Sequence, residues 1–260
     1  MFNRSFPRRH LPATFLMFVL LIGLKASPAR AETSGALLAR VRSYHSELSD
    51  VYLKMAVAHE NQDVLSRISG DLGQFVKYGF RKFDYYFKSP DKVRIESNAL
   101  LFHKLRGISI RNGDTKNFYV PALRIHKTAD VTGQAYKKED ALDFGLLTGD
   151  VWDDFNIWYV RTENFGGTWV YSLGMRPKNA PNGGTMIVRL DTSTLRVIER
   201  DRYTNQGVPV QRQFYSNFVH PLPHVWLPAL IKLYDGQSHY AGDLVFSKLV
   251  VNSGLSNSIF

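Results

Sequence analysis

The stretch FDYYFKSPDKVRIE, residues 83–96, decides the fold of this chain. Apolar and polar side chains alternate on both sides of Ser89-Pro90-Asp91-Lys92, a run of turn-forming residues. A period of two is typical of a half-buried β-strand, and a short turn between two such strands makes an antiparallel hairpin. We therefore predict two paired strands whose apolar side chains face a common core.

The same period of two recurs on both sides of this hairpin and extends almost to the end of the chain. Turn residues such as Asn112-Gly113-Asp114 separate the candidate strands, and Pro121 ends one of them. Strands joined by short turns favour an antiparallel meander within one domain. The other candidate strands are 51–57, 118–120, 158–160, 169–173, 186–190, 195–200, 210–215, 225–234 and 240–251.

Two segments show helical spacing instead. Apolar residues recur every three or four positions in 34–48, and Thr33 or Ser34 provides an N-cap in front of them. A second, shorter pattern covers 137–147. The fold class that follows is α+β, with most of the chain in an antiparallel sheet.

Residues 1–31 have the three parts of a secretory signal peptide. A basic start precedes a ten-residue apolar run at 15–24, and Ala29-Arg30-Ala31 offers a small-residue cleavage site. The run is short for a membrane-spanning helix, which needs about 20 residues. We expect cleavage after Ala31 and export to the periplasm.

The net charge of +10 falls by half once this segment is set aside. The segment contains five Lys and Arg residues and no Asp or Glu, so residues 32–260 keep 28 basic residues against 23 acidic ones. No basic block remains, which argues against a nucleic-acid partner. The chain has no Cys, which excludes disulfides, zinc-thiolate and iron–sulfur sites and a lipid-modified Cys. We expect residues 32–260 to be a single, untethered domain.

Catalytic motifs are absent from the sequence, which has no G-x-S-x-G, H-E-x-x-H, P-loop or G-x-G-x-x-G pattern. His220 and His224 have the spacing of a helical metal site. Pro221 and Pro223 forbid a helix there, so we expect no metal and no cofactor.

Two pairs of carboxylates, Asp153-Asp154 and Asp140 with Asp143, have the chemistry for acid–base catalysis. Such residues more often occupy loops and helix caps. The enzymatic alternative is an exported hydrolase that uses Asp153 or Asp154 with a His. No sequence feature favours it, and we expect a protein that is not an enzyme.

Aromatic residues make up 13% of the chain, and many of them occur in candidate strands. A single sheet buries one face only where something covers it. The helix over 34–48 covers part of that face, and the rest of a concave face has room for an apolar ligand, as in ligand-holding barrels. The simpler alternative is that these residues only pack a core.

The candidate ligand-facing side chains are those on the apolar side of the first three strands. A register error of one residue would turn all of them outward. They are Val51, Leu53, Met55, Val57, Phe83, Tyr85, Phe87, Val93 and Ile95.

The order of these motifs resembles the LolA-like outer-membrane lipoprotein-sorting proteins. The likeness covers nearly all of residues 34–260 and follows a signal peptide. The motifs are a strand–Pro–turn–strand hairpin at 87–95, a turn into a strand at 112–119, a short helical segment at 142–149, a hairpin at 187–191 with 194–195, and C-terminal strands at 225–228, 249–252, 254–255 and 259–260.

The resemblance implies an antiparallel sheet curved into a half-open barrel, with helices as a lid over the concave apolar face and acyl chains held inside. It implies a carrier or binding protein for acylated cargo, lipoprotein or lipid, in outer-membrane lipoprotein sorting. In dedicated carriers of the family, an Arg just before the hairpin Pro latches the lid by hydrogen bonding. Here that position is Ser89, and Arg94 across the hairpin is not equivalent, so the chain departs from the family at the latch.

The partners that the resemblance implies are the acyl chains of a lipoprotein or lipid and a membrane transporter or acceptor complex. We expect a monomer and no nucleic acid. The alternative function on the same fold is a periplasmic sensor that binds lipid or lipoprotein and regulates a membrane partner.

Overall fold

The computed structural model describes residues 33–68, 70–98, 105–138, 144–180 and 182–260. Within it, Thr33–Phe260 forms one compact unit. The signal peptide predicted for 1–31 lies outside the described residues, and so do Asp140 and Asp143. Among the described helices, none is both long and apolar enough to cross a membrane.

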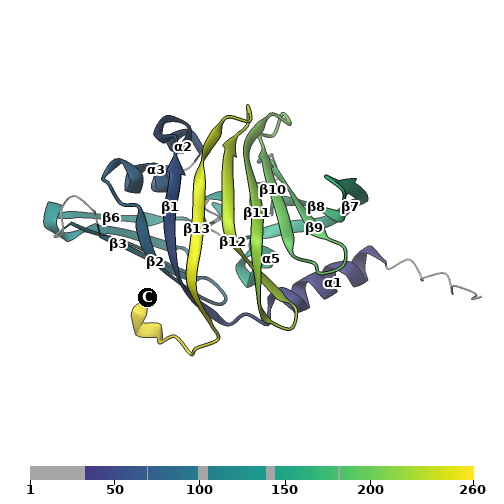
Figure 1. Ribbon diagram of the computed structural model, residues 1–260, viewed down its shortest axis with the longest axis horizontal. Coiled ribbons are helices and arrows are strands. Elements are labelled where there is room, and N and C mark those ends of the chain that lie inside the picture. Colours follow the sequence, from purple (N-terminus) through teal and green to yellow (C-terminus); the bar gives the residue numbers. More distant parts are fainter. Residues whose placement is uncertain (1–32, 69, 99–104, 139–143, 181) are drawn as a thin grey trace, which may run out of the picture. The chain divides into compact units, whose positions relative to one another are not determined.

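An antiparallel sheet of 13 strands forms most of the described chain (Figure 1). Its strand order is β6-β5-β4-β3-β2-β1-β13-β12-β11-β10-β9-β8-β7, so two meanders meet where β1 pairs with β13. The predicted antiparallel sheet is confirmed, and it is open, with β6 and β7 at its two edges. The strands are β1 (Asp50–Glu60), β2 (Lys82–Lys88), β3 (Lys92–Asn98), β4 (Arg106–Asn112), β5 (Thr115–Val120), β6 (Ile125–Asp130), β7 (Phe155–Phe165), β8 (Thr168–Pro177), β9 (Thr185–Asp191), β10 (Val197–Tyr203), β11 (Pro209–Leu222), β12 (Val225–Asp235) and β13 (Tyr240–Val251).

The described helices are short. The predicted first helix is confirmed as α1, and Thr33 is its N-cap, with the Oγ1 atom accepting a hydrogen bond from the N–H of Ala36 at 3.3 Å. The helix ends at His45, so Leu48 is buried in the segment that follows. The helices are α1 (Ser34–His45), α2 (Gln62–Ile68), α3 (Gly70–Lys77), α4 (Ala135–Lys138) and α5 (Gly149–Asp154), with 3₁₀ turns η1 (Pro121–Leu123) and η2 (Asn257–Ile259).

Of the helix predicted over 137–147, the described residues confirm 137–138 and contradict 144–147. Helix α4 ends at Lys138, residues 139–143 lie outside the described part, and residues 144–147 are not helical. Gly145 has φ of +71°, which a right-handed helix does not allow. A Cβ at this position would lie 2.9 Å from a ring carbon of Tyr215, so only glycine fits this close approach.

Several other elements differ from the sequence prediction. Helices α2, α3 and α5 and strands β4 and β6 were not predicted. Strand β10 begins at Val197, two residues later than expected, because Leu195 lies in the preceding turn with φ of +58°.

The burial pattern confirms the predicted period of two in the first meander. On β1, Val51, Leu53 and Met55 are at most 1% exposed, whereas Lys54 between them is exposed. The apolar side of β2 is buried in the same way. One face of these strands therefore belongs to the core of the protein.

Candidate functional site

Three rows of side chains lie on the face of the sheet that is buried at β1 and β2; two of the rows extend to β6 and one extends to β4. The antiparallel register places one residue of each strand beside the next on that face. Row 1 consists of Leu53, Tyr85, Ile95, Ser109, Phe118 and Lys127; row 2 of Val51, Phe87, Val93, Arg111, Lys116 and Ala129; and row 3 of Met55, Phe83, Ser97 and Gly107. All the predicted site residues except Val57 lie in these rows, and Val57 follows Met55 on the same face of β1.

Three of the predicted site residues contact aromatic rings from other segments of the protein. Phe144 packs edge-on to Tyr85 and Phe87, with ring centroids 4.7 and 5.9 Å apart. Phe75 of α3 packs edge-on to Phe83 with centroids 5.4 Å apart. The sequence therefore predicted which face of these strands is buried, and the role of these residues as ligand contacts stays a prediction.

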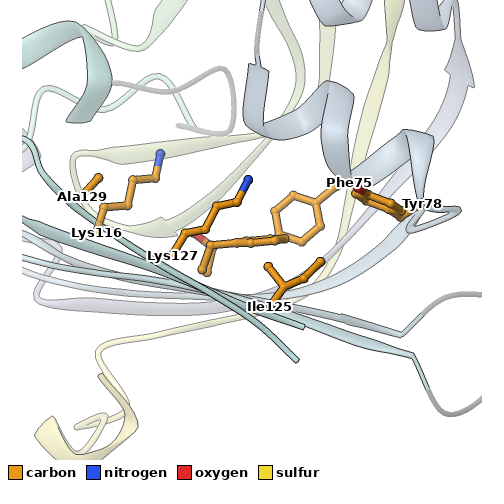
Figure 2. A pocket seen from close by; sticks show the side chains of 8 residues that line it. Phe75, Tyr78, Lys116, Ile125, Lys127 and Ala129 are labelled. Carbon is orange, nitrogen blue, oxygen red and sulfur yellow. The ribbon is translucent and has the colours of Figure 1, made fainter. Parts of the chain in front are cut away.

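An open cavity of about 220 Å³ lies farther along the rows, at β4, β5 and β6 (Figure 2). It is larger than an engineered apolar cavity of about 150 Å³ that binds benzene, and smaller than the roughly 300 Å³ at which typical ligand pockets begin. Its lining residues are Phe75, Tyr78, Ser109, Lys116, Phe118, Ile125, Lys127 and Ala129. None of the predicted site residues is among them.

Helix α3 and the residues just after it supply the upper wall of the cavity. Phe75 is 1% exposed and packs edge-on to Phe118 at 5.3 Å and to Phe80 at 5.7 Å. The N–H of Phe80 donates to the carbonyl of Phe75 at 3.0 Å, which fixes the end of the helix. Gly107 of row 3 makes room for both rings, because a Cβ there would lie 3.0 Å from Phe75 and 3.1 Å from Phe80.

Two lysines distinguish the mouth of the cavity from its interior. Lys116 follows Arg111 in row 2, and Lys127 follows Phe118 in row 1. Figure 2 shows their ammonium groups on the same side of the strands as Phe75. The cavity therefore combines an apolar interior with a cationic mouth.

A buried ion pair fastens the same face of the sheet to α5. Arg111 of row 2 lies 2.8 Å from Asp150, and both side chains are less than 10% exposed. The Oγ1 atom of Thr148 also donates to Asp150 at 2.5 Å. A buried pair of this kind is costly to break, since removal of one partner leaves the other charge uncompensated.

The two histidines considered as metal ligands have separate partners. The ring of His220 stacks on Trp226 with centroids 4.1 Å apart, and that of His224 stacks on Tyr44 at 4.0 Å. His224 also contacts Glu47 through its Nδ1 atom at 2.5 Å. Within the described residues, no group of three potential metal-ligating side chains lies together.

The carboxylates considered for acid–base chemistry are ion-paired separately. Asp154 contacts Lys138 at 2.9 Å, while Asp153 is largely exposed and lies 4.0 Å from Arg42. Neither is among the cavity-lining residues.

Ser89 occupies the hairpin position at which the dedicated LolA-like carriers have an Arg. The N–H of Ser89 donates to the carbonyl of Ser49 at 2.8 Å. Arg94 contacts Glu96 and donates through Nη1 to the carbonyl of Ile259 at 2.6 Å, so it holds the C-terminal segment.

Sequence reasoning missed the cavity-lining residues for two reasons. Neither α2 nor α3 was predicted. A signal for α2 was present, because Asn61 precedes it as a capping residue and accepts a hydrogen bond from the N–H of Val64 at 3.3 Å. The sequence prediction covers only the apolar side chains of the first three strands, whereas the stems of Lys116 and Lys127 also line apolar surface while their charges stay at the edge. The alternation of β5 around Phe118 was the signal that could have located this site.

Comparison with protein-family models gives no match, and comparison with curated protein sequences gives none either. Solved structures do match. A structure described as an outer membrane lipoprotein-sorting protein domain from Vibrio parahaemolyticus matches with a TM-score of 0.59 and 14% identity, over 85% of this chain and 94% of that one. A DUF1329 family protein from Desulfovibrio piger matches with a TM-score of 0.54 and 16% identity, over 86% and 94% of the two chains. A LolA superfamily protein from Nitrosomonas europaea matches with a TM-score of 0.53 and 13% identity, over 85% and 96%. The chain therefore has a LolA-like fold.

Proposed function

We propose that this protein is an exported carrier or binding protein for acylated cargo, a lipid or a lipoprotein, and that it performs no reaction. The observation that carries the proposal is the cavity lined by Phe75 of α3 and Phe118 of β5. The LolA-like fold supports it, because one structural neighbour is described as a lipoprotein-sorting domain. A role in outer-membrane lipoprotein sorting, with a membrane transporter or acceptor complex as partner, belongs to the same proposal.

The cavity suits the end of an acyl chain rather than a whole lipid. Each methylene removed from water contributes about 0.8 kcal/mol, so even half a dozen of them favour binding by about 5 kcal/mol before ordering costs. Longer chains need more room than about 220 Å³. Displacement of the Phe75 ring would extend the cavity toward Phe83 and the apolar ends of the rows, where the predicted site residues lie.

Helices α2 and α3 are the proposed cover of the apolar face. Helix α2 contacts β12 and β13, and its Val64, Leu65 and Ile68 are buried in the core. Helix α3 places Phe75 over β2 and β5. Movement of this cover would expose the buried side chains of α2 and Phe75, so bound cargo has to replace their contacts with the sheet.

The N-terminal part of the proposal concerns processing. Residues 1–31 act as a signal peptide that is cleaved after Ala31, and 32–260 is the single binding domain, which works in the periplasm. The lack of Cys supports an untethered domain, because a lipid-modified N-terminus requires that residue.

A pair of substitutions on one strand tests the proposal. Ala129 lines the cavity, whereas its neighbour Thr128 points to the opposite face of β6, and both are exposed. Ala129→Phe should fill the cavity and weaken binding of a fluorescent fatty-acyl probe by about tenfold or more. Thr128→Phe should bind the probe as the unmodified protein does. Equal binding by both variants would contradict this site.

A further inference from the structure

The rows change character along their length. Where they start, on β1 and β2, Leu53, Met55, Phe83 and Phe87 are all buried and apolar. Where they end, on β5 and β6, the rows contain Lys116 and Lys127, which line the cavity (Figure 2). An occupant that fits both ends has an apolar part and an anionic part.

We propose that the cavity takes an amphiphile with one anionic head, a carboxylate or a phosphate, which Lys116 and Lys127 bind while the tail lies against Phe75 and Phe118. This inference rests on the proposed function and adds the class of ligand. It separates fatty acids and anionic phospholipids from neutral lipids such as diacylglycerols.

The local charge balance supports an anion at this position. On β4, Arg106 is paired with Glu96 and Arg111 with Asp150, so the cations of these strands that line the cavity are Lys116 and Lys127. Asp130 is the one acidic residue of β4, β5 and β6. The Oδ1 atom of Asp130 accepts hydrogen bonds from the N–H and hydroxyl of Thr132 at 2.8 and 2.6 Å. Asp114, in the turn before β5, is paired with Lys138 at 2.5 Å. Asp130 and Asp114 are therefore held by Thr132 and Lys138.

The geometry of the two lysines suits one shared head. The register places Lys127 opposite Phe118 and Lys116 opposite Ala129, in adjacent rows on the same face of neighbouring strands. Side chains at such diagonal positions lie within reach of each other when they are long. Their stems can cover the aromatic wall while both ammonium groups meet the anion at the edge.

An alternative role for Lys127 is protection of the sheet edge. Lys127 lies on the edge strand β6, and lysines on edge strands prevent pairing with other chains. That role predicts no preference among ligands of equal tail length. Ligands that share a tail and differ in the head therefore distinguish the two roles.

The test compares dodecanoate, dodecyl phosphate and dodecanol as competitors of a fluorescent acyl probe, with the protein expressed from the full chain. We expect both anions to bind about tenfold more tightly than dodecanol at low salt, and the preference to shrink as salt rises. Lys116→Gln with Lys127→Gln should reduce the two anions to the affinity of dodecanol and leave dodecanol unchanged. Lys232→Gln, an exposed lysine on β12, is the matched control and should retain the preference.

The outcomes separate this inference from the proposed function. Equal binding of dodecanol and dodecanoate by the unmodified protein, or a preference that survives in the double variant, would overturn the anionic head and leave an acyl carrier. Displacement of the probe by inorganic phosphate alone would point to a site for free anions and would also overturn it. Binding of none of the three chains would overturn the proposed function itself.

Discussion

The ring of Phe75, on α3, lies edge-on to the ring of Phe118, on β5, with centroids 5.3 Å apart and an angle of 75° between the planes. This contact joins the helix to the sheet at the inner wall of the cavity. Phe75 is 1% exposed and belongs to the core, so Phe75→Ala should lower the free energy of unfolding by about 3–5 kcal/mol. Urea denaturation measures the change.

Tyr78 provides the matched comparison for Phe75, because it lines the same cavity but is 39% exposed. Tyr78→Ala should cost about 1 kcal/mol of stability or less and should still weaken the binding of an acyl probe. If both variants lost stability equally, the wall formed by Phe75 would not be a part of the core.

His45 connects three distant segments and should make stability depend on pH. Its Nδ1 atom accepts from the N–H of Leu147 at 2.9 Å, so the proton is on Nε2, which lies 3.3 Å from the carbonyl of Leu195. Burial lowers the pKa of His45 to about 4, and the charge of Arg200 adds to this. The unfolded chain takes up a proton near pH 6.5 and the folded one does not, so this group removes up to about 3 kcal/mol of stability as pH falls from 6.5 to 4.

The variant His45→Gln separates this effect from the rest of the protein. It should be less stable at pH 7, because the hydrogen bond to Leu147 is altered, but its stability should fall less than that of the unmodified protein between pH 6.5 and 4. Denaturant titrations at several pH values measure both slopes. If stability fell equally with pH in the variant and in the unmodified protein, His45 would take up its proton in the folded protein between pH 6.5 and 4, and the lowered pKa would be contradicted.

Glu199 should give the opposite slope. Burial, together with the charge of Asp201, raises the pKa of Glu199 to about 7, although Arg189 donates to it at 2.6 Å. The folded protein therefore keeps a proton between pH 4.5 and 7 that the unfolded chain has released, and this contribution to stability is lost as pH rises through that window. Glu199→Gln should reduce the fall in the free energy of unfolding between pH 5 and pH 7. Denaturant titrations at these two pH values measure the fall. An unchanged difference between the two pH values would contradict the raised pKa.

The ion pair between Arg111 and Asp150 should stabilise the attachment of α5 to the sheet. Asp150→Asn leaves Arg111 buried without its charge partner and should cost about 3–5 kcal/mol. Asp153→Asn, on the same helix, is the control, because that side chain is 74% exposed and should change stability by less than about 0.5 kcal/mol. Similar costs for the two variants in thermal or urea unfolding would contradict a buried pair.

Local pattern was enough to predict most of the sheet and the buried face of its first strands. The alternation through Leu53, Met55, Phe83 and Tyr85 is a property of the strands themselves, and the structure confirms which side of them is buried. The pairing of β1 with β13 joins segments that are far apart in the sequence, and no local pattern specifies such a contact.

The position of the cavity could not be predicted, because it depends on which rings cover the rows. Phe144 covers Tyr85 and Phe87 from a segment for which the sequence predicts a helix, and Gly145 beside it adopts a backbone that only tertiary packing explains. The cavity lies instead beside Phe118, whose neighbours on the same face are Lys116 of β5 and Lys127 of β6. A search for buried apolar side chains passes over such a site.

Native mass spectrometry of the protein purified from the compartment in which it accumulates tests the central claim most directly. The account predicts one bound lipid on the unmodified protein and on Thr128→Phe, and a large loss of that lipid on Ala129→Phe. Proteins free of lipid in every case, or the same bound lipid on Ala129→Phe as on Thr128→Phe, would contradict a carrier that holds acyl chains in the cavity between α3 and the sheet.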